Sequence, residues 1–381
     1  MKKVLIITPG FYPAKTYGGP VVSISNLIEA FVGEIEFFVV TSDHELKEKK
    51  QLKGIKKGWN QVGNTKVMYL SDKDMTSTMF ENIYNQIHPD CIYLNAIFHK
   101  LSTPKILKLA KRKNIKCILS IRGGLCENAL QFGRIKKILY LQFLKIIKGK
   151  NILYHSTSTE ETLGIKKYMG EKSQIVEISN MPLLLNPLEL PNKSIKNKGI
   201  IRMIYVSRIH PIKNLNYILE ILNNTRVNVK FDIYGPKENK EYWKECELII
   251  KNLPSNVQVR YCGFLDKENR NNIFKDYDLF VLPTQSENFG HAISEALSER
   301  CNILISNNTP WNDINDFKAG RAFDLKEKGK FLEYIEKIAE MSNEEIEENR
   351  SDIEEYLKYH FDYKNMKKKY FNMLCNSNKT I

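Results

Sequence analysis

The sequence lacks three features that would assign its class at once: a long hydrophobic run, paired cysteines and closely spaced histidines. Its longest apolar runs fall far short of the roughly 20 residues that a membrane-spanning helix needs. Its seven cysteines are scattered and form no C-x-x-C pair, which excludes the common zinc and thiol-redox motifs and favours reduced, buried thiols. Its seven histidines form no pair at metal-ligand spacing on a helix or hairpin. We therefore expect neither a transmembrane helix nor a metal site.

The N-terminal residues also lack the pattern of a secretory signal. The apolar stretch after Met1 is too short, and the segment Pro9–Pro13 (Pro-Gly-Phe-Tyr-Pro) replaces a small-residue cleavage site. This stretch therefore predicts a first strand and its loop. We expect a cytoplasmic protein.

Basic residues are in excess, but their distribution is uneven. The formal net charge is +14, and 47 of the 58 basic residues are lysines. Residues 101–150 hold thirteen Lys or Arg and one acid, Glu127, which is +12 of that total, whereas the region around 333–355 is acidic. The sequence therefore predicts one local basic surface rather than a basic protein throughout.

Short apolar runs alternate with helical stretches twice along the 381 residues. Such runs predict two parallel sheets built from βαβ units, that is, two doubly wound Rossmann-like α/β domains that face each other across a cleft. The expected strands of the first series are Val4–Ile7, Phe37–Val40, Val67–Tyr69, Cys91–Leu94, Cys117–Ser120 and Ile152–Tyr154. Those of the second are Met203–Val206, Val229–Tyr234, Val257–Tyr261, Leu279–Leu282 and Asn302–Ile305.

A segment with three prolines and little periodicity separates the two series. We expect domains over 1–180 and 200–355, a linker over 181–199, and a C-terminal helix within 356–381 that returns to the N-terminal domain.

The stretch Glu287–Glu295 (ENFGHAISE) carries the clearest chemical signal. It follows the buried strand ending at Leu282, so Glu287 belongs to a loop at the carboxyl end of that strand, where open α/β sheets bind ligands. A carboxylate accepts hydrogen bonds from hydroxyls, and backbone amides at a helix start bind oxygen anions. The stretch therefore suits a polyhydroxylated, phosphorylated ligand.

Three further strand ends carry matching features. Arg208 and Lys213 follow one strand, and such a cation pair at a strand-to-helix turn suits a diphosphate. Gly235 and Gly263 end two others and allow close backbone approach. Each feature alone is typical of an ordinary loop.

In this order the elements resemble retaining glycosyltransferases of family 4, which have the two-Rossmann GT-B fold. The resemblance is carried by Ser207–Asn214, Tyr234–Pro236, Gly263-Phe264 and Glu287–Glu295, and it extends to Ile305–Trp311. The first half matches more loosely. Its Pro9–Pro20 loop resembles the Gly-Gly loop of the family, and His155–Glu160 resembles a strand-end element. Many relatives have a histidine where this chain has Arg122, a permanent cation that we expect to substitute for it.

The resemblance implies roles for these residues. Arg208, Lys213 and Glu287 would be catalytic: the two cations neutralise the leaving diphosphate, and Glu287 holds sugar hydroxyls. Glu295 would bind the ribose, and the donor phosphate itself would take the acceptor proton, without a metal or other cofactor. The implied donor contacts are Gly18, Gly19, Arg122, Gly235, Gly263, Phe264, Leu265, Asn288, Phe289, Gly290 and Glu295. The substrates would be a nucleoside-diphosphate sugar and a glycan, which we expect to be a lipid-linked O-antigen, lipopolysaccharide or capsule intermediate that gains an α-linkage.

Rival functions use the same residues. A glycosidase would use Glu287 and Glu295 as its two carboxylates, but it leaves the cations without a role. A nucleotide-sugar epimerase of similar fold would need an acid/base set in the cleft. Asp276-Tyr277-Asp278 has the D-x-D form of a metal site, although a turn or cap role suits its position before a strand.

The segment 134–148 is basic and amphipathic, with six apolar residues on one helical face. An ordinary helix packed on the sheet explains this pattern. The alternative is attachment to an anionic membrane surface, on the inner face of the cytoplasmic membrane. A nucleic-acid-binding protein would need aromatic residues among the cations or a recognised module, and we find neither. The apolar face comprises Ile135, Ile138, Leu139, Phe143, Ile146 and Ile147.

Overall fold

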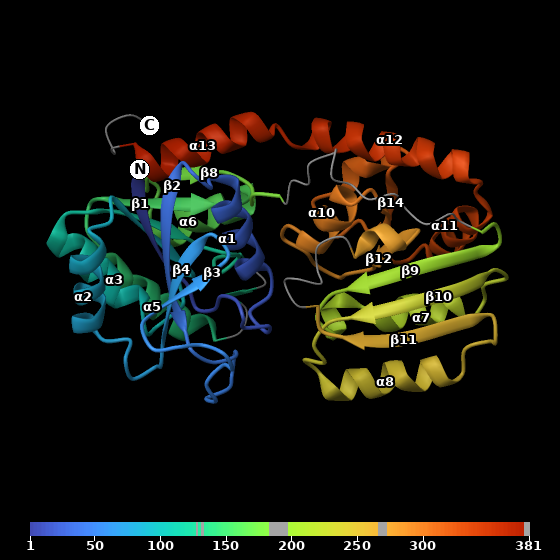
Figure 1. Cartoon of the computed structure of the whole chain (residues 1–381), viewed down its shortest axis with the longest axis horizontal. Coiled ribbons are helices and arrows are strands. Elements are labelled where there is room, and N and C mark those ends of the chain that lie inside the picture. The colour runs from blue at the N-terminus through green and yellow to red at the C-terminus, as the bar shows by residue number, and fades with distance from the viewer. Residues whose placement is uncertain (127–128, 131–132, 183–196, 266–272, 377–381) are drawn as a thin grey trace. The chain divides into compact units, whose positions relative to one another are not determined.

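The computed structural model describes residues 1–126, 129–130, 133–182, 197–265 and 273–376. The chain divides into two compact units (Figure 1). Unit 1 comprises Met1–Met181 and Tyr363–Ile381, and unit 2 comprises Pro182–Asp362. Most of the expected linker over 181–199 lies outside the described residues.

Unit 1 is built on an eight-stranded sheet in the order β3-β4-β2-β1-β5-β6-β7-β8. Neighbouring strands are parallel, except that β3 pairs antiparallel with β4. The strands are β1 (Lys2–Ile7), β2 (Ile35–Ser42), β3 (Trp59–Val62), β4 (Thr65–Leu70), β5 (Cys91–Asn95), β6 (Lys116–Ser120), β7 (Ile152–Ser156) and β8 (Ile175–Glu177).

Helices cover both faces of this sheet, because alternate side chains of its buried strands point to opposite sides. Leu5 and Ile7 of β1 pack in one core with the apolar sides of α2 (Ser77–Ile87), α3 (Thr103–Lys113), α5 (Arg134–Ile147) and α6 (Thr159–Met169). Val4 and Ile6 pack in the other core with α1 (Gly19–Ala30) and α13 (Tyr363–Cys375). The C-terminal helix α13 therefore completes the core of unit 1.

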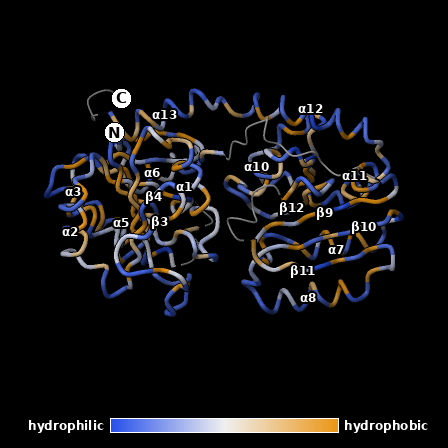
Figure 2. The backbone as a smooth tube through the Cα atoms, viewed as in Figure 1, coloured by the Kyte–Doolittle hydropathy of each residue, from blue (hydrophilic) through white to orange (hydrophobic). Residues whose placement is uncertain are grey.

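Unit 2 has a six-stranded parallel sheet in the order β11-β10-β9-β12-β13-β14. Strands β12 and β13 are buried along their whole length and mostly apolar, as expected of a parallel sheet covered on both faces. Figure 2 shows hydrophobic and hydrophilic residues alternating along the helices and strands of both units. The strands are β9 (Ile200–Val206), β10 (Asn228–Tyr234), β11 (Val257–Gly263), β12 (Leu279–Leu282), β13 (Asn302–Ser306) and β14 (Gly320–Phe323).

The helices of unit 2 follow the strands in the βαβ pattern. Short 3-10 turns lie between some of them. The helices are α7 (Leu215–Leu222), α8 (Lys240–Lys251), α10 (His291–Ser298), α11 (Lys328–Glu340) and α12 (Asn343–His360), and the 3-10 turns are η2 (Pro211–Lys213), η3 (Phe274–Asp276) and η4 (Asn312–Asp316). Within 356–381, where one helix was expected, α12 ends at His360 and α13 begins at Tyr363.

All eleven predicted strands are present, and the prediction of two doubly wound α/β sheets is confirmed. The predicted sheets were wholly parallel, whereas β3 is antiparallel. None of the described helices combines the length and the apolar character that a bilayer crossing requires.

Candidate active site

The strand order of unit 2 reverses between β9 and β12. The chain runs outward from β9 through β10 to β11, and then returns to place β12 on the other side of β9. Loops after two such strands leave the sheet in opposite directions and open a crevice at their carboxyl ends, which is where doubly wound sheets bind ligands. Lys213 follows β9 and Glu287 follows β12, so two of the three predicted catalytic residues flank this switch point.

Backbone contacts hold these two loops together. The carbonyl of Ile212 accepts hydrogen bonds from the backbone amide of Gln285 (2.7 Å) and the hydroxyl of Thr284 (3.0 Å). Next to it, Lys213 Nζ lies 2.7 Å from Glu287 Oε2 and forms an ion pair. The Lys213 side chain is 9% exposed and that of Glu287 19%. Because both side chains are largely shielded from water, their attraction is less screened than that of a surface salt bridge.

Arg208 extends outward from the end of β9. It is exposed and pairs with Glu238, so its guanidinium is held near the surface of the unit. The backbone beside it is tightly packed. A Cβ on Gly235 would lie 1.8 Å from the carbonyl oxygen of Ser207, and the φ of Gly235 is +137°. Only glycine fits here, which explains the strand-Gly motif at the end of β10.

The end of β11 lies beside the end of β10 at the same edge of the sheet. The amide of Gly235 donates to the carbonyl of Gly263 at 2.7 Å, which joins the two glycine-ended strands. Gly263 has a φ of +82°, and a Cβ there would meet nothing within 4 Å. Phe264 is half-buried and Leu265 buried. Glycine is therefore required at position 263 for its backbone conformation rather than for space.

The motif that begins at Glu287 forms a turn and a helix start. Gly290 has a φ of +79° and is the N-cap of α10, with Asn288 exposed before it and Phe289 buried. The first amides of α10 therefore face the same edge of the sheet as Glu287. Glu295 lies within α10 and is only 3% exposed, so its predicted contact with a ribose stays a prediction.

Unit 1 has its own switch point, between β1 and β5, and the predicted Gly-Gly loop follows β1 there. Gly18 has a φ of +65° and is the N-cap of α1, and Gly19 is exposed at the start of this helix. Gly10 lies beneath the ring of Tyr17, where a Cβ would overlap it at 2.0 Å. The loop is thus built so that the amides at the start of α1 remain accessible.

Arg122, at the end of β6, is held by neutral groups. Its guanidinium donates to the side-chain oxygens of Asn95 and Asn180, and to the hydroxyl of Tyr93 at 3.1 Å. None of these three hydrogen-bond partners, all among the described residues, carries a negative charge. The positive charge of Arg122 is therefore positioned but not neutralised, as its predicted role beside a phosphorylated donor requires.

His155 lies behind this arginine and is completely buried. Its Nε2 donates to the carbonyl of Ile178 at 2.9 Å, so its Nδ1 accepts from the hydroxyl of Tyr93 at 2.8 Å. Burial, with a contribution from the nearby charge of Arg122, lowers the pKa of His155 to about 3. The imidazole is therefore neutral and serves to orient Tyr93 and, through it, Arg122.

Comparison with known proteins agrees with this geometry. Residues 188–358, which include every element of the unit 2 site, match the model of the family described as glycosyl transferases group 1. Over 263 residues the chain is 25% identical to the capsular polysaccharide biosynthesis glycosyltransferase CapH of Staphylococcus aureus, covering 60% of this chain and 70% of that protein. Unit 2 is a glycosyltransferase domain of this family.

Solved structures show the fold of this glycosyltransferase over nearly its full length. Alr3699/HepE of Anabaena, in complex with UDP and glucose, has a TM-score of 0.69 at 14% identity, with 98% of this chain and 99% of that chain covered. Sucrose-phosphate synthase of Thermosynechococcus elongatus has a TM-score of 0.68 at 14% identity, with 98% of each chain covered. The prediction of a GT-B fold is confirmed.

Several residues that position the glycosyltransferase site were not identified from the sequence. Thr284 is completely buried and ties the loop of Glu287 to Ile212 and Ser286. Trp311, also completely buried, donates its indole N–H to the carbonyl of Phe289. Both contact backbone groups distant in sequence, so no local pattern indicates these roles, although Trp311 ends the stretch 305–311 that resembles the family.

Two carboxylates have the same positioning role in unit 1. Glu161 is buried and accepts from the amides of Gly123 and Thr157, which fixes the loop that carries Arg122. Glu45 accepts from the amides of Lys15 and Thr16 in the loop before Gly18. Each carboxylate replaces water as the acceptor for loop amides, and neither belongs to a motif.

The D-x-D stretch has structural partners. Asp276 ends η3, and the Asp278 carboxylate accepts from the backbone amide of Arg202 and pairs with its guanidinium at 2.9 Å. Within the described part of the chain, no group of three or more acidic, cysteine or histidine side chains is arranged to hold a metal ion. The geometry thus supports the turn and packing role for this stretch.

Proposed function

We propose that this glycosyltransferase transfers a hexose or an N-acetylhexosamine from a nucleoside-diphosphate sugar to a glycan, with retention of configuration and without a metal ion. The observation that carries the proposal is the Lys213–Glu287 pair at the switch point of unit 2. It presents a cation and a carboxylate side by side, which is what a diphosphate linked to a sugar requires.

The chemistry follows from the charges. As the bond between the sugar and the diphosphate breaks, negative charge develops on the leaving oxygen, and Lys213 with Arg208 stabilises it. Glu287 accepts hydrogen bonds from sugar hydroxyls, and its negative charge favours the positive charge that develops on the sugar ring. The acceptor hydroxyl passes its proton to a donor phosphate oxygen, so no separate protein base is needed.

The structure weakens the glycosidase alternative. A glycosidase needs one protonated carboxylic acid beside a second carboxylate that faces the same sugar. Glu287 is already paired with the ammonium of Lys213 at 2.7 Å, and Glu295 is buried in α10. This pair of carboxylates therefore suits donor binding better than acid catalysis.

The acceptor we propose is a lipid-linked intermediate of a surface polysaccharide, such as a capsule or the O-antigen of lipopolysaccharide. Support comes from the similarity to a capsular polysaccharide glycosyltransferase. The known complex of a protein of the same fold with UDP and glucose supports a nucleoside-diphosphate sugar as donor.

The experiment is a donor screen followed by product analysis. Thermal unfolding of the full chain is measured with UDP-, GDP- and ADP-sugars, and the stabilising donor is incubated with lipid-linked oligosaccharides. We expect one donor class to raise the unfolding temperature, and the new linkage to show the small anomeric proton coupling of an α-hexoside of the gluco or galacto series. A β-linked product would contradict retention from an α-configured donor, and release of free sugar alone would favour hydrolysis.

A further inference from the structure

Helix α5 does not pack as the ordinary sheet-covering helix, the first of the two alternatives that the sequence offered. The side chains that it buries are Leu141 and Leu144, which join the core of unit 1. At about 100° per residue, Ile135, Leu139 and Ile146 fall within about 40° of one another on the opposite side of the helix. The apolar face that an ordinary packed helix would bury thus points outward.

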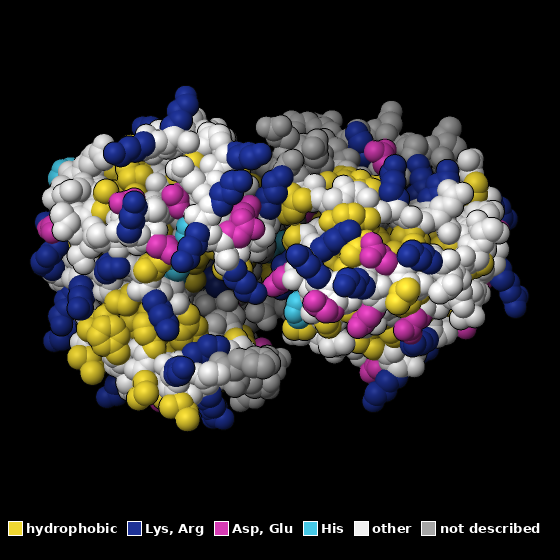
Figure 3. Space-filling view, turned by 90° about the horizontal axis from the view of Figure 1, so that it is seen from below, with side chains coloured by type: hydrophobic (Ala, Val, Ile, Leu, Met, Phe, Trp, Pro, Cys, Tyr) yellow, Lys and Arg dark blue, Asp and Glu magenta, His cyan; other side chains and the backbone are white. Residues whose placement is uncertain are grey.

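This outward face is the most exposed aliphatic surface among the described residues of unit 1. Ile135 is 75% exposed, Leu139 65% and Ile146 77%, and the neighbouring Phe143 is 42% exposed. We call these four residues the apolar stripe. Figure 3 shows hydrophobic side chains gathered on one surface of unit 1, with Lys and Arg side chains around them. A contiguous exposed apolar surface of this kind is typical of a site that contacts a membrane or another protein.

Basic side chains border the stripe. On α5 itself, Arg134 and Lys136 are exposed and Lys145 is half-buried. Lys137 and Lys148 are turned inward: Lys137 Nζ donates to the carbonyl of Ala129, and burial lowers the pKa of Lys148. The first three therefore contribute to the surface charge, and the last two to packing.

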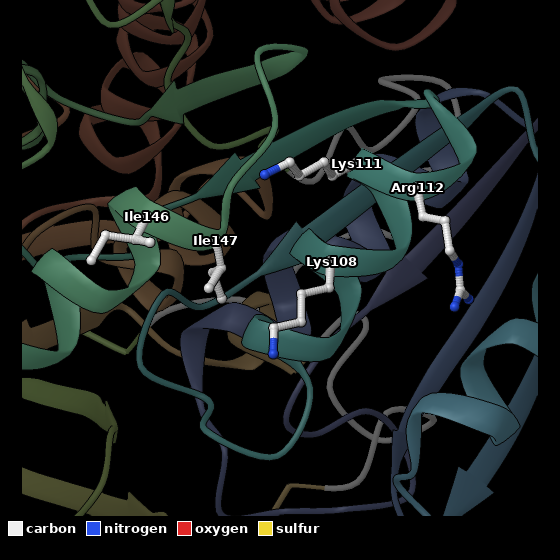
Figure 4. Close-up of a pocket in the computed structure, with 5 residues that line it drawn as sticks. All are labelled: Lys108, Lys111, Arg112, Ile146 and Ile147. Atoms are coloured by element: carbon white, nitrogen blue, oxygen red, sulfur yellow. The ribbon is translucent and has the colours of Figure 1, made fainter.

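The neighbouring helix α3 extends the basic border. A surface pocket of about 420 Å³ is lined by Lys108, Lys111 and Arg112 of α3, together with Ile146 and Ile147 of α5 (Figure 4). Arg112 pairs with Glu81 at 2.6 Å. Lys108 and Lys111 are exposed, and the described residues offer them no carboxylate within ion-pair distance. The pocket therefore joins one end of the apolar stripe to two unneutralised cations.

We propose that the apolar stripe and its basic border attach unit 1 to an anionic lipid bilayer. The 14 residues of α5 span about 21 Å, so the helix lies along the surface, with the stripe among the acyl chains and the lysines at the head groups. Charge complementarity selects this occupant, because residues 101–150 carry thirteen basic residues and one acid. A bilayer supplies both the anionic and the apolar phase that the surface presents.

The test is co-sedimentation of the full chain with vesicles of phosphatidylglycerol and phosphatidylcholine. The apolar variant is Ile135→Gln/Leu139→Gln/Ile146→Gln, which leaves the net charge unchanged. Its matched control is Leu163→Gln/Leu248→Gln, which removes two leucines of similar exposure (60% and 61%) from α6 and α8. The charge variant is Lys108→Gln/Lys111→Gln/Lys136→Gln/Lys145→Gln.

We expect the wild type and the control to bind these vesicles, and the apolar and charge variants each to bind at least tenfold more weakly. Each surface charge contributes roughly fivefold near an anionic membrane, and this part of the affinity weakens as salt is added. All four proteins should unfold at similar temperatures, because the replaced side chains are largely outside the core.

Three results would overturn the proposal: no binding of the wild type, equal binding of the apolar variant, or equal binding of the wild type to vesicles of phosphatidylcholine alone. A dimer in lipid-free solution that the apolar variant dissociates would assign the stripe to a second copy instead. Donor stabilisation, measured on the same variants, should stay at the wild-type level. A failure of the membrane proposal can thus be distinguished from a failure of the proposed transferase function.

Discussion

The two units share a topology but differ in the charges at the carboxyl edges of their sheets. In unit 2, Lys213 and Glu287 form a shielded ion pair between the loops after β9 and β12. In unit 1, Arg122 is held by Asn95, Asn180 and Tyr93, which are all neutral. The same sheet edge therefore serves different chemistry in each unit, and function is determined by the side chains at that edge rather than by the fold.

The surfaces of the units differ as well. Unit 1 contains the basic stretch 101–150 and the outward apolar face of α5, whereas unit 2 contains the acidic region around 333–355. We infer that unit 2 binds the donor, and that unit 1 brings the enzyme to its acceptor.

The largest expected effect comes from removing the charge of Lys213. Lys213→Met should lower the rate of transfer at least a hundredfold, because one group that stabilises developing charge contributes about 3–4 kcal/mol. The matched control is Lys116→Met in unit 1, a half-buried lysine that donates to the carbonyl of Asn376. Steady-state transfer assays give the comparison. If Lys213→Met transferred the sugar at a rate within threefold of the wild type, the catalytic role assigned to unit 2 would be wrong.

Loss of Lys213 also leaves Glu287 without its partner, so stability has to be measured separately. The double variant Lys213→Met/Glu287→Gln removes both charges and should unfold closer to the wild-type temperature than Lys213→Met does. If the double variant unfolds at a lower temperature than Lys213→Met, Glu287 stabilises the fold through contacts other than its pair with Lys213.

Glycine substitutions at two strand ends of unit 2 should differ in severity. Gly235→Ala introduces a Cβ that overlaps the Ser207 carbonyl, so we expect a loss of about 3 kcal/mol or more in the free energy of unfolding. The Cβ of Gly263→Ala would have no atom within 4 Å. Only the unfavourable φ should then lower the free energy of unfolding, by about 1 kcal/mol. Urea unfolding of both variants measures this difference. Equal losses would show that close packing at the end of β10 is unimportant.

Acidification should destabilise unit 1 through His155. Its pKa is about 3 in the folded unit, against about 6.5 when unfolded, so the unfolded state binds the proton first as pH falls. The free energy of unfolding is unaffected above about pH 7, and it decreases by about 2 kcal/mol by pH 5 from this residue alone. Hydrogen exchange followed by mass spectrometry, corrected for intrinsic rates, measures each unit at both pH values. Protection in unit 1 that is unchanged at pH 5 would contradict the buried, neutral assignment.

The smallest effect on transfer is expected at Trp311. Trp311→Phe keeps an aromatic ring in the core but removes the N–H that bonds the Phe289 carbonyl, which costs about 1–3 kcal/mol of stability. Transfer should fall severalfold because the turn before α10 loses a positioning contact. Phe31→Leu, in the core of unit 1, is the control and should change stability without changing the donor KM. An unchanged donor KM in Trp311→Phe would show that the turn is fixed by other contacts.

The sequence predicted the strands well because buried parallel strands are short apolar runs between helices. It missed β3, whose residues Trp59–Val62 include two amides, and it missed the short strands β8 and β14. It also identified Lys213 and Glu287 separately, but their pairing depends on the Ile212 carbonyl, which joins two loops about 70 residues apart. Such contacts depend on tertiary structure and leave no local pattern.

The amphipathic pattern of α5 was predicted from the sequence, but the sequence left open whether its apolar face meets the core or a membrane surface. A helical period shows which residues share a face, and only the packing of Leu141 and Leu144 shows that this face is turned away from the core. The roles of Arg122 and Glu295 stay predictions, because their contacts with a donor depend on a bound ligand.

The most direct test of donor binding by unit 2 is calorimetric titration of the full chain with UDP, GDP and ADP. We predict that one of them binds at a single site, that Lys213→Met weakens its binding at least tenfold, and that Lys116→Met binds it as the wild type does. Binding of none of the three, or equal affinity in Lys213→Met and wild type, would contradict the assignment of the donor diphosphate to the Lys213–Glu287 site.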